Sequence, residues 1–274
     1  MEQVAILKSS ARTACKFCDS LLTVRLGFTH ARKQRYLCHS CRRTFVNNGA
    51  PPGMKYASSV IVSALCQFYE GASLHWIRRS LMLQHGVQPD HANIRRWIAR
   101  YTRQAVMALG GVRPHVGDQW VVHETRVTTH TPGSKPVWLW DLMDTETRFL
   151  LATGFSVKRS ALDFNALLDL ATRRANAWPT VVLADVLLPE IESAQNRFEV
   201  RPSTNMVRRV LGILRDRNPV VQRLVSRNAA HLVVSGWAVH YNFFGAHPDL
   251  GAKTPAEAAG VESPLKTWAN VVAI

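Results

Sequence analysis

Two C-x-x-C pairs near the N-terminus constrain the fold of this chain more than any other feature. Cys15 and Cys18 form the first pair, Cys38 and Cys41 form the second, and nineteen residues lie between them. This spacing is typical of a zinc ribbon, in which each pair places two thiolates on one turn and the two pairs complete a tetrahedral site. Such a closed site leaves no open coordination position, so the expected zinc is structural.

Other interpretations of the cysteines explain less of the pattern. Two disulfides or a redox-active pair would leave the second pair and its basic surroundings unexplained, and five cysteines are few for a disulfide scaffold in 274 residues. Short alternating segments at Leu22–Leu26 and Gln34–Leu37, followed by Thr44–Val46, predict the strands of the ribbon. The fifth cysteine, Cys66, lies in an apolar helical pattern and is expected to be a core thiol.

The charge distribution indicates a polyanionic partner. The formal net charge is +15, and residues 1–112 carry 16 basic against 4 acidic side chains, which leaves most of the excess in the N-terminal part. A basic excess of this kind is the electrostatic footprint of a nucleic-acid-binding protein. No apolar run is long enough to span a membrane and no signal peptide is evident. We therefore expect an intracellular protein with no membrane partner, cytoplasmic and nucleoid-associated if the host is prokaryotic.

The segment after Gly49–Gly53, which has the composition of a linker, has the periodicity of three helices. The first ends at Gly71, the second covers Ser73–His85, and Pro89-Asp90 opens the third. A helix followed by a tight turn and a basic helix is the pattern of a helix-turn-helix. The pattern predicts that the last helix enters the major groove of double-stranded DNA. Asn and Arg suit adenine and guanine edges. The candidate DNA-binding residues of this helix are Asn93, Arg95, Arg96, Arg100 and Arg103. A solvated basic face of an ordinary bundle is the alternative.

The C-terminal part has the pattern of an α/β domain. Strands are predicted at Gln119–Thr129, Val137–Met143, Arg148–Phe155 and Val181–Ala184, with a helix over Ala161–Asn176. Three strands in a meander, a helix and a buried fourth strand predict an RNase H-like core with a mixed sheet flanked by helices. The fourth strand ends beside Asp185.

The order of motifs resembles insertion-sequence transposases that join a zinc ribbon, a helix-turn-helix and a DDE catalytic domain. The matching residues, beyond the cysteine pairs and the helices, are Trp120–Thr125, Leu139–Asp144, Ala184-Asp185, Leu214–Arg217, His240–Phe244, His247, Leu250 and Thr254–Gly260. The resemblance implies three domains: a ribbon over 1–48, a helix-turn-helix over 49–112 and an RNase H-like domain over 113–274. It also implies a DNA partner and a homo-oligomer, expected to be a dimer.

Such a catalytic site needs three carboxylates to hold two divalent cations about 4 Å apart. The resemblance implies that the positions of the family's three catalytic acids are occupied here by His123, Asp185 and Arg208. Only Asp185 is a carboxylate. Histidine is a poor ligand for magnesium, and the permanent charge of Arg208 would repel cations. Glu124 does not replace the first acid, because adjacent residues of a strand point to opposite faces. The stretch between Asp185 and Asn205 is also shorter than is usual in the family.

The remaining acids and histidines are not expected to replace the missing carboxylates. Surface roles are expected for the carboxylates Glu190, Glu192 and Glu199, turn or helix-surface roles for Asp141, Asp144 and Asp216, and packing or DNA contacts for His231, His240 and His247. The arginine-rich segment 197–227, which includes Arg215 and Arg217, is expected to contribute a basic surface along DNA.

These observations favour a transposase-like DNA-binding protein that has lost strand transfer and serves as a repressor or an architectural protein. One alternative is an active transposase that uses magnesium or manganese with Asp185 and rearranged acids. Another is a zinc-ribbon interaction module, which would leave the basic third helix without a role. Whether the chain is an enzyme is therefore left open, and magnesium is expected only for the active alternative.

Overall fold

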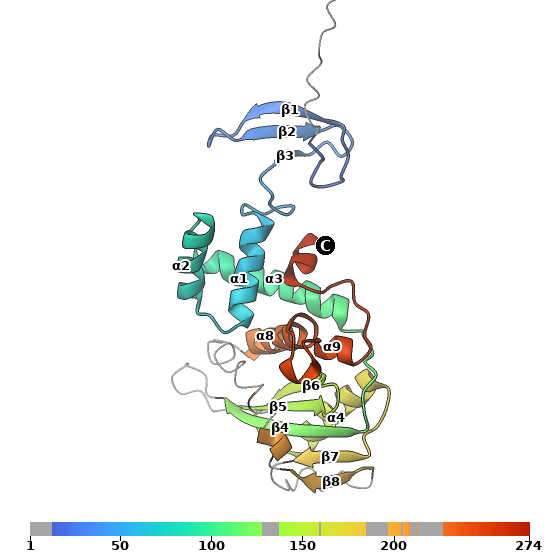
Figure 1. Cartoon of the computed structure of the whole chain (residues 1–274). Helices are drawn as coiled ribbons and strands as arrows, with labels where there is room; N and C mark the ends of the chain where they lie inside the picture. The colour runs from blue at the N-terminus through green and yellow to red at the C-terminus, as the bar shows by residue number, and fades with distance from the viewer. Residues whose placement is uncertain are drawn as a thin grey trace, which may run out of the picture. The chain divides into compact units, whose positions relative to one another are not determined.

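The computed structural model describes residues 13–127, 137–158, 160–184, 197–203, 205–208, 212 and 227–274. The chain divides into two compact units, and the boundary falls between Ile61 and Val62. This boundary lies within helix α1 (Ser58–Tyr69). Figure 1 labels the elements of both units.

The first unit is a three-stranded antiparallel sheet in the order β1 (Thr23–Phe28), β2 (Gln34–Cys38) and β3 (Thr44–Val46). The three predicted strands are confirmed. The core of the unit contains Cys15, Cys38 and Phe45, with Phe17 and Tyr36 packed against them. A core this small buries little apolar surface, so the cysteine cluster described below has to supply much of the stability.

The segment Gly49–Gly53 is packed rather than an extended linker. Ala50 is buried and the Gly49 carbonyl accepts a hydrogen bond from the Ser58 N–H. The proline and glycine content of the segment therefore makes a turn that leads into α1.

The second unit opens with helices whose ends follow the expected capping rules. Helix α2 (Leu74–His85) begins at Ser73, whose hydroxyl accepts from the Trp76 N–H, and ends at Gly86 in the left-handed conformation. Helix α3 (His91–Leu109) begins at Asp90, whose carboxylate accepts from the Asn93 N–H. Both caps satisfy backbone donors that the helix itself cannot pair.

A five-stranded mixed sheet forms the centre of the second unit, in the order β6-β5-β4-β7-β8. Strand β5 is antiparallel to β4 and β6, whereas β7 is parallel to both β4 and β8. The strands are β4 (Gln119–Val127), β5 (Val137–Asp144), β6 (Leu150–Ser156), β7 (Val181–Ala184) and β8 (Glu199–Pro202). This order and these directions are those of an RNase H-like core, and the predicted α/β class is confirmed. Strand β8 was not predicted.

Helices cover the two faces of the sheet. Helix α4 (Ala161–Ala175) lies on one face, where Phe164 packs against Trp140 of β5. Helix α8 (Arg227–Val239) lies on the other, where Val234 forms a cluster with Val127 and Leu139. Figure 1 shows α8 along the sheet between the strands and the helices α1 and α3.

Close packing joins α1 and α3 to α8. The Tyr69 hydroxyl of α1 and the Thr102 hydroxyl of α3 form a buried hydrogen bond of 2.5 Å. Both side chains lie directly over Gly236 of α8, where a Cβ atom would overlap the Tyr69 hydroxyl. Only glycine lets the three helices approach so closely.

The C-terminal elements pack on the same helices. A π-helix (His240–Phe244) is followed by a short 3-10 helix (Pro248–Leu250), α9 (Pro255–Ala258) and α10 (Trp268–Ala273). The Trp268 ring stacks on Tyr69 with centroids 4.9 Å apart, and its indole N–H donates to His240 Nδ1 at 3.2 Å. Tyr69, at the C-terminal end of α1, therefore packs against Trp268 as well as against α8.

Candidate functional site

The four cysteines of the first unit come together as a single cluster. Their sulfur atoms all lie within 4.8 Å of one another. The Sγ atoms of Cys15 and Cys41 are 3.6 Å apart, and those of Cys18 and Cys38 are 3.7 Å apart. Zinc–sulfur bonds in a tetrahedron imply sulfur separations of about 3.8 Å. The arrangement therefore fits a tetrahedral metal ion of zinc's size.

Titration of the cluster also suits a cation. Hydrogen bonding from the backbone of Cys41 lowers the pKa of the Cys38 thiol to about 6, against the effect of burial. At Cys18 the backbone of Ser20 favours the thiolate, but burial and the three neighbouring thiols raise its pKa to about 12. Four thiols this close cannot all ionise unless a cation compensates the charge, because each thiolate disfavours the next.

A basic groove of about 460 Å³ lies beside the cluster in the same unit. Its lining includes four cationic side chains and two aromatic rings, namely Lys16, Lys33, Arg35, Lys55, Phe17 and Phe45. Among the lining residues there is no carboxylate. Cationic side chains beside aromatic faces suit a nucleic-acid strand, which offers phosphates and bases together.

The four arginines predicted on α3 form one exposed face. Arg95, Arg96, Arg100 and Arg103 are all exposed, and at 3.6 residues per turn they fall within a sector of about 140°. Asn93 is half-buried at the edge of this face, and its side-chain oxygen accepts from Arg96 at 3.0 Å. The opposite face is buried and includes Thr102, which contacts α8. Packing of α3 within the second unit therefore leaves the arginine face open to solvent.

His123 lies in the middle of the central strand β4, in a row of polar residues that crosses the sheet. Its register partner on β5 is Asp141, whose partner on β6 is Thr153. Directly paired residues of an antiparallel sheet share a face, so these three side chains lie on one side. His123 is 8% exposed and Asp141 is 1% exposed, and His123 Nε2 lies 3.1 Å from the Thr125 hydroxyl.

The expectation of a surface or turn role for Asp141 was wrong. Its carboxylate is buried beside His123, because β4 and β5 pair with these two residues opposite each other. Asp144 is the last residue of β5 and is fully buried, so it lies one residue before the turn in which it was expected. Its carboxylate accepts from the Thr147 N–H at 2.7 Å and from the Thr147 hydroxyl at 2.6 Å in the turn that follows.

The other two predicted site positions follow the parallel strands. Strand β7 ends at Ala184, one residue before Asp185 in the sequence, and Asp185 lies outside the described residues. After β8, residues 205–208 form a helical turn in which Val207 is buried and Arg208 is exposed. The side chain of Arg208 is thus accessible to solvent.

The remaining candidates divide between surface residues and residues outside the described ranges. Glu199 is exposed and forms an ion pair of 2.6 Å with Arg201 on the same strand, which fits the expected surface role. The candidates outside the described residues, besides Asp185, are Glu190, Glu192, Arg215, Asp216 and Arg217.

The three histidines do not gather at one site. His240 contacts Glu70 and Trp268, His231 packs its ring against Phe155, and His247 accepts from the Asp249 N–H. Within the described ranges, the four cysteines are the one group of His, Cys, Asp and Glu side chains placed to hold a metal ion.

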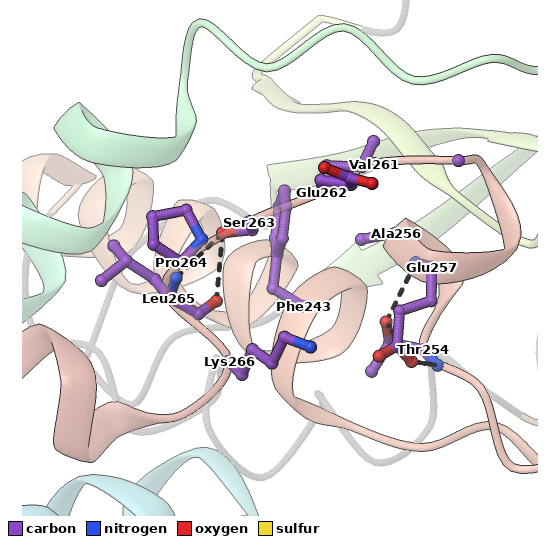
Figure 2. A pocket seen from close by; sticks show the side chains of 11 residues that line it. Phe243, Thr254, Ala256, Glu257, Val261, Glu262, Ser263, Pro264, Leu265 and Lys266 are labelled. Carbon is purple, nitrogen blue, oxygen red and sulfur yellow. Dashed lines mark hydrogen bonds between the residues drawn. The ribbon is translucent and has the colours of Figure 1, made fainter.

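A pocket of about 800 Å³ along the C-terminal segment contains none of the predicted site residues (Figure 2). Three of its polar side chains, those of Thr254, Glu257 and Ser263, form hydrogen bonds with nearby backbone groups. Thr254 and Glu257 form the capping box of α9, and the Ser263 hydroxyl bonds with the backbone of Leu265. The Thr254–Gly260 motif therefore serves to begin and end a short helix.

No helix of the described residues is long and apolar enough to cross a membrane.

Comparison with known proteins gave similarities to solved structures alone. No family model matches the chain, and no curated protein does. The integrase catalytic core domain of HTLV-2 with magnesium, in its dimeric form, is similar at 18% identity and a TM-score of 0.38, over 54% of this chain and 99% of that chain. The simian T-cell lymphotropic virus intasome with the PP2A regulatory subunit B56 gamma is similar at 14% identity and a TM-score of 0.41, over 74% of each chain. The Mos1 strand transfer complex is similar at 11% identity and a TM-score of 0.33, over 81% of this chain and 76% of that chain.

Proposed function

We propose that this chain is a transposase-like protein that binds double-stranded DNA and has lost the two-metal chemistry of strand transfer. In this proposal, residues 1–48 form a zinc ribbon, residues 49–112 form a helix-turn-helix and residues 113–274 form an RNase H-like domain. It places the protein at DNA in the cytoplasm, as a repressor or an architectural protein.

The exposed arginine face of α3 is the observation that carries DNA binding. Four guanidinium groups project from one side of a helix whose other side is buried, and the helix follows a tight turn after α2. Within the described residues, none of these arginines forms an ion pair with a carboxylate. Guanidinium groups on one helix face suit guanine edges and phosphates of the major groove.

The zinc ribbon supplies a second basic surface. The cysteine cluster fits zinc by its sulfur separations, and the groove beside it adds four cationic side chains. Zinc bound by Cys15, Cys18, Cys38 and Cys41 would stabilise the ribbon, and the groove would contribute phosphate contacts.

The loss of strand transfer is supported by the side chains at the expected acid positions. His123 occupies the centre of β4, and Arg208 follows β8. Neither residue offers the oxygen ligands that magnesium prefers, and Arg208 brings a permanent positive charge. The described positions therefore do not fit a pair of magnesium ions.

A binding experiment with matched variants tests the DNA proposal. We expect the full chain to select a preferred duplex from a random pool, and expect the double variant Arg95→Ala, Arg96→Ala to lose about 1–3 kcal/mol for each guanine contact removed. Lys253→Gln, which removes one exposed charge elsewhere in the second unit, is the control. Equal affinities of the parent and the double variant for the selected duplex would refute the assignment to α3.

A cleavage assay distinguishes this proposal from the active alternative. Asp141, buried beside His123, is the feature that favours the alternative, because it could supply an acid that the resemblance does not place there. We expect no magnesium- or manganese-dependent nicking or strand transfer on the selected duplex. Activity in the parent that disappears in Asp185→Ala would overturn the proposed loss and favour an active transposase.

The proposed assembly is a homodimer, since two helix-turn-helix units one helical turn apart would bind a palindromic site. Sedimentation of the protein with and without the selected duplex tests this. A complex with one chain per duplex would contradict it.

A further inference from the structure

A second cationic pocket opens at the edge of the sheet, on the side of strand β6. It has a volume of about 470 Å³ and is lined by residues from the end of α3, from β6, from α4 and from α8. Three arginines line it, Arg113, Arg173 and Arg174, and none of the lining residues is a carboxylate. All of these residues belong to the second unit.

Arg174 is the unusual member of this set. Its Nε is buried and has no hydrogen-bond partner, and its guanidinium lies over the Phe149 ring, 5.0 Å from the centroid. Burial lowers the pKa of Arg174 to about 10. Stacking on a ring orients the guanidinium plane but does not neutralise its charge, so the group lacks the partner that buried cations require.

A second buried group in the same pocket also lacks a partner. The Thr153 hydroxyl lines the pocket, is buried, and forms no hydrogen bond. An unpaired buried hydroxyl costs free energy, and so does an unpaired guanidinium edge. The pocket is therefore lined by two groups without hydrogen-bond partners, one from β6 and one from α4.

Basic residues near the end of α4 could simply pair with the backbone of the helix. The contacts show this for Arg173 but not for Arg174. Cations in the last turn of a helix often pair with its terminal carbonyls. Arg173 does so, since its Nε donates to the Asp169 carbonyl at 3.0 Å. Arg174 forms no such bond and faces the pocket instead.

We propose that this pocket binds a phosphate group, with the half-buried Arg174 as the central cation, Thr153 as a neutral donor, and Arg113 and Arg173 at the rim. A phosphate has several acceptor oxygens, carries negative charge, and accepts two parallel hydrogen bonds from an arginine. The group belongs either to a DNA backbone or to a small phosphorylated molecule. The pocket has the size of a small-ligand site.

Inorganic phosphate is the first probe. The full zinc-loaded chain is titrated with sodium phosphate against sodium chloride of equal ionic strength, by calorimetry and by thermal shift. We expect binding that weakens about tenfold or more in Arg174→Gln and less strongly in Thr153→Val. Lys253→Gln should match the parent. Phosphate binding of equal strength in the parent and in Arg174→Gln would overturn the proposal. It would also be overturned if neither phosphate binding nor DNA binding depended on Arg174.

A second variant keeps the proposal testable even if Arg174→Gln does not fold. Arg113 and Arg173 are exposed, so the double variant Arg113→Gln, Arg173→Gln removes two charges from the rim without disturbing the core. It should also weaken phosphate binding. Unchanged binding in this double variant would count against the pocket even if Arg174→Gln does not fold.

A duplex of random sequence identifies the source of the phosphate. If Arg174→Gln lowers duplex affinity and free phosphate competes with the duplex, the group is a DNA phosphate. If duplex affinity is unchanged while phosphate binding is lost, the ligand is a small phosphorylated molecule. The variant Arg95→Ala, Arg96→Ala should retain phosphate binding, so a failure of the DNA-binding proposal for α3 is distinguishable from a failure of this one.

Discussion

The side-chain amide of Asn242 pairs with the backbone of Leu150 at the edge of the sheet. Its Oδ1 accepts from the Leu150 N–H at 2.9 Å and its Nδ2 donates to the Leu150 carbonyl at 3.0 Å. Asn242 is fully buried in the π-helix and β6 is an edge strand. The amide therefore takes the place of a neighbouring strand and protects this edge from pairing with other chains.

Replacing this amide should destabilise the second unit. Asn242→Leu leaves a donor and an acceptor of Leu150 buried without partners, at a cost of about 1–3 kcal/mol for each group. Asn242→Asp keeps the acceptor alone and should fall between the parent and Asn242→Leu. Urea unfolding measures both. A loss below the error of the measurement in Asn242→Leu would show that the pair contributes nothing.

The cysteine cluster should contain one zinc ion per chain. Cys38→Ser should release the metal and unfold the first unit, because thiolate coordination drives the folding of such small modules, while the second unit retains its structure. Cys66→Ser, which changes a cysteine outside the cluster, should keep the zinc. Elemental analysis of protein purified without chelators measures both, and a parent free of zinc would contradict the assignment.

Gly236 should not tolerate a side chain. Gly236→Ala places a methyl group against the Tyr69 hydroxyl and Thr102, and such overpacking costs about 1–3 kcal/mol. Gly111→Ala is the control, since a Cβ atom there meets nothing within 4 Å. Equal melting temperatures for the two variants would mean that α1, α3 and α8 are packed less closely than described. Adding Tyr69→Phe and Thr102→Ser should recover part of the loss.

The contact between Glu70 and His240 gives a prediction for acidic pH. His240 Nδ1 accepts from the Trp268 indole, so its Nε2 carries a proton and lies 3.0 Å from Glu70 Oε1. This hydrogen bond lowers the pKa of Glu70. When a carboxyl group has a lower pKa in the folded state than in the unfolded chain, its ionised form stabilises the fold at pH values above the unfolded-state pKa. This stabilisation is lost as the pH falls through the folded-state pKa.

The measurement compares the parent with Glu70→Gln. The Glu70 side chain is 71% exposed, so the difference at neutral pH should stay below about 1 kcal/mol. This difference in stability should shrink further as the pH falls below the ordinary pKa of a glutamate carboxyl group. A difference that grows toward acidic pH would show that the carboxylate does not act through this hydrogen bond.

Local patterns in the sequence predicted much of the fold. The cysteine spacing implied the cluster, the caps at Ser73 and Asp90 set the starts of α2 and α3, and β7 has the predicted bounds. Each of these features depends on residues near one another in the chain, where periodicity and capping act directly. Helix periodicity likewise separated the arginine face of α3 from its buried face.

The tertiary structure decided which distant residues meet. Asp141 lies beside His123 because β4 and β5 pair in one register, and Asn242 caps Leu150 across a separation of 92 residues. The Arg174 guanidinium lies over the Phe149 ring because α4 packs against the sheet near its edge. Sequence alone could establish the type of each residue and its local conformation. Its partner and its burial depend on how the elements pack, which no local pattern specifies.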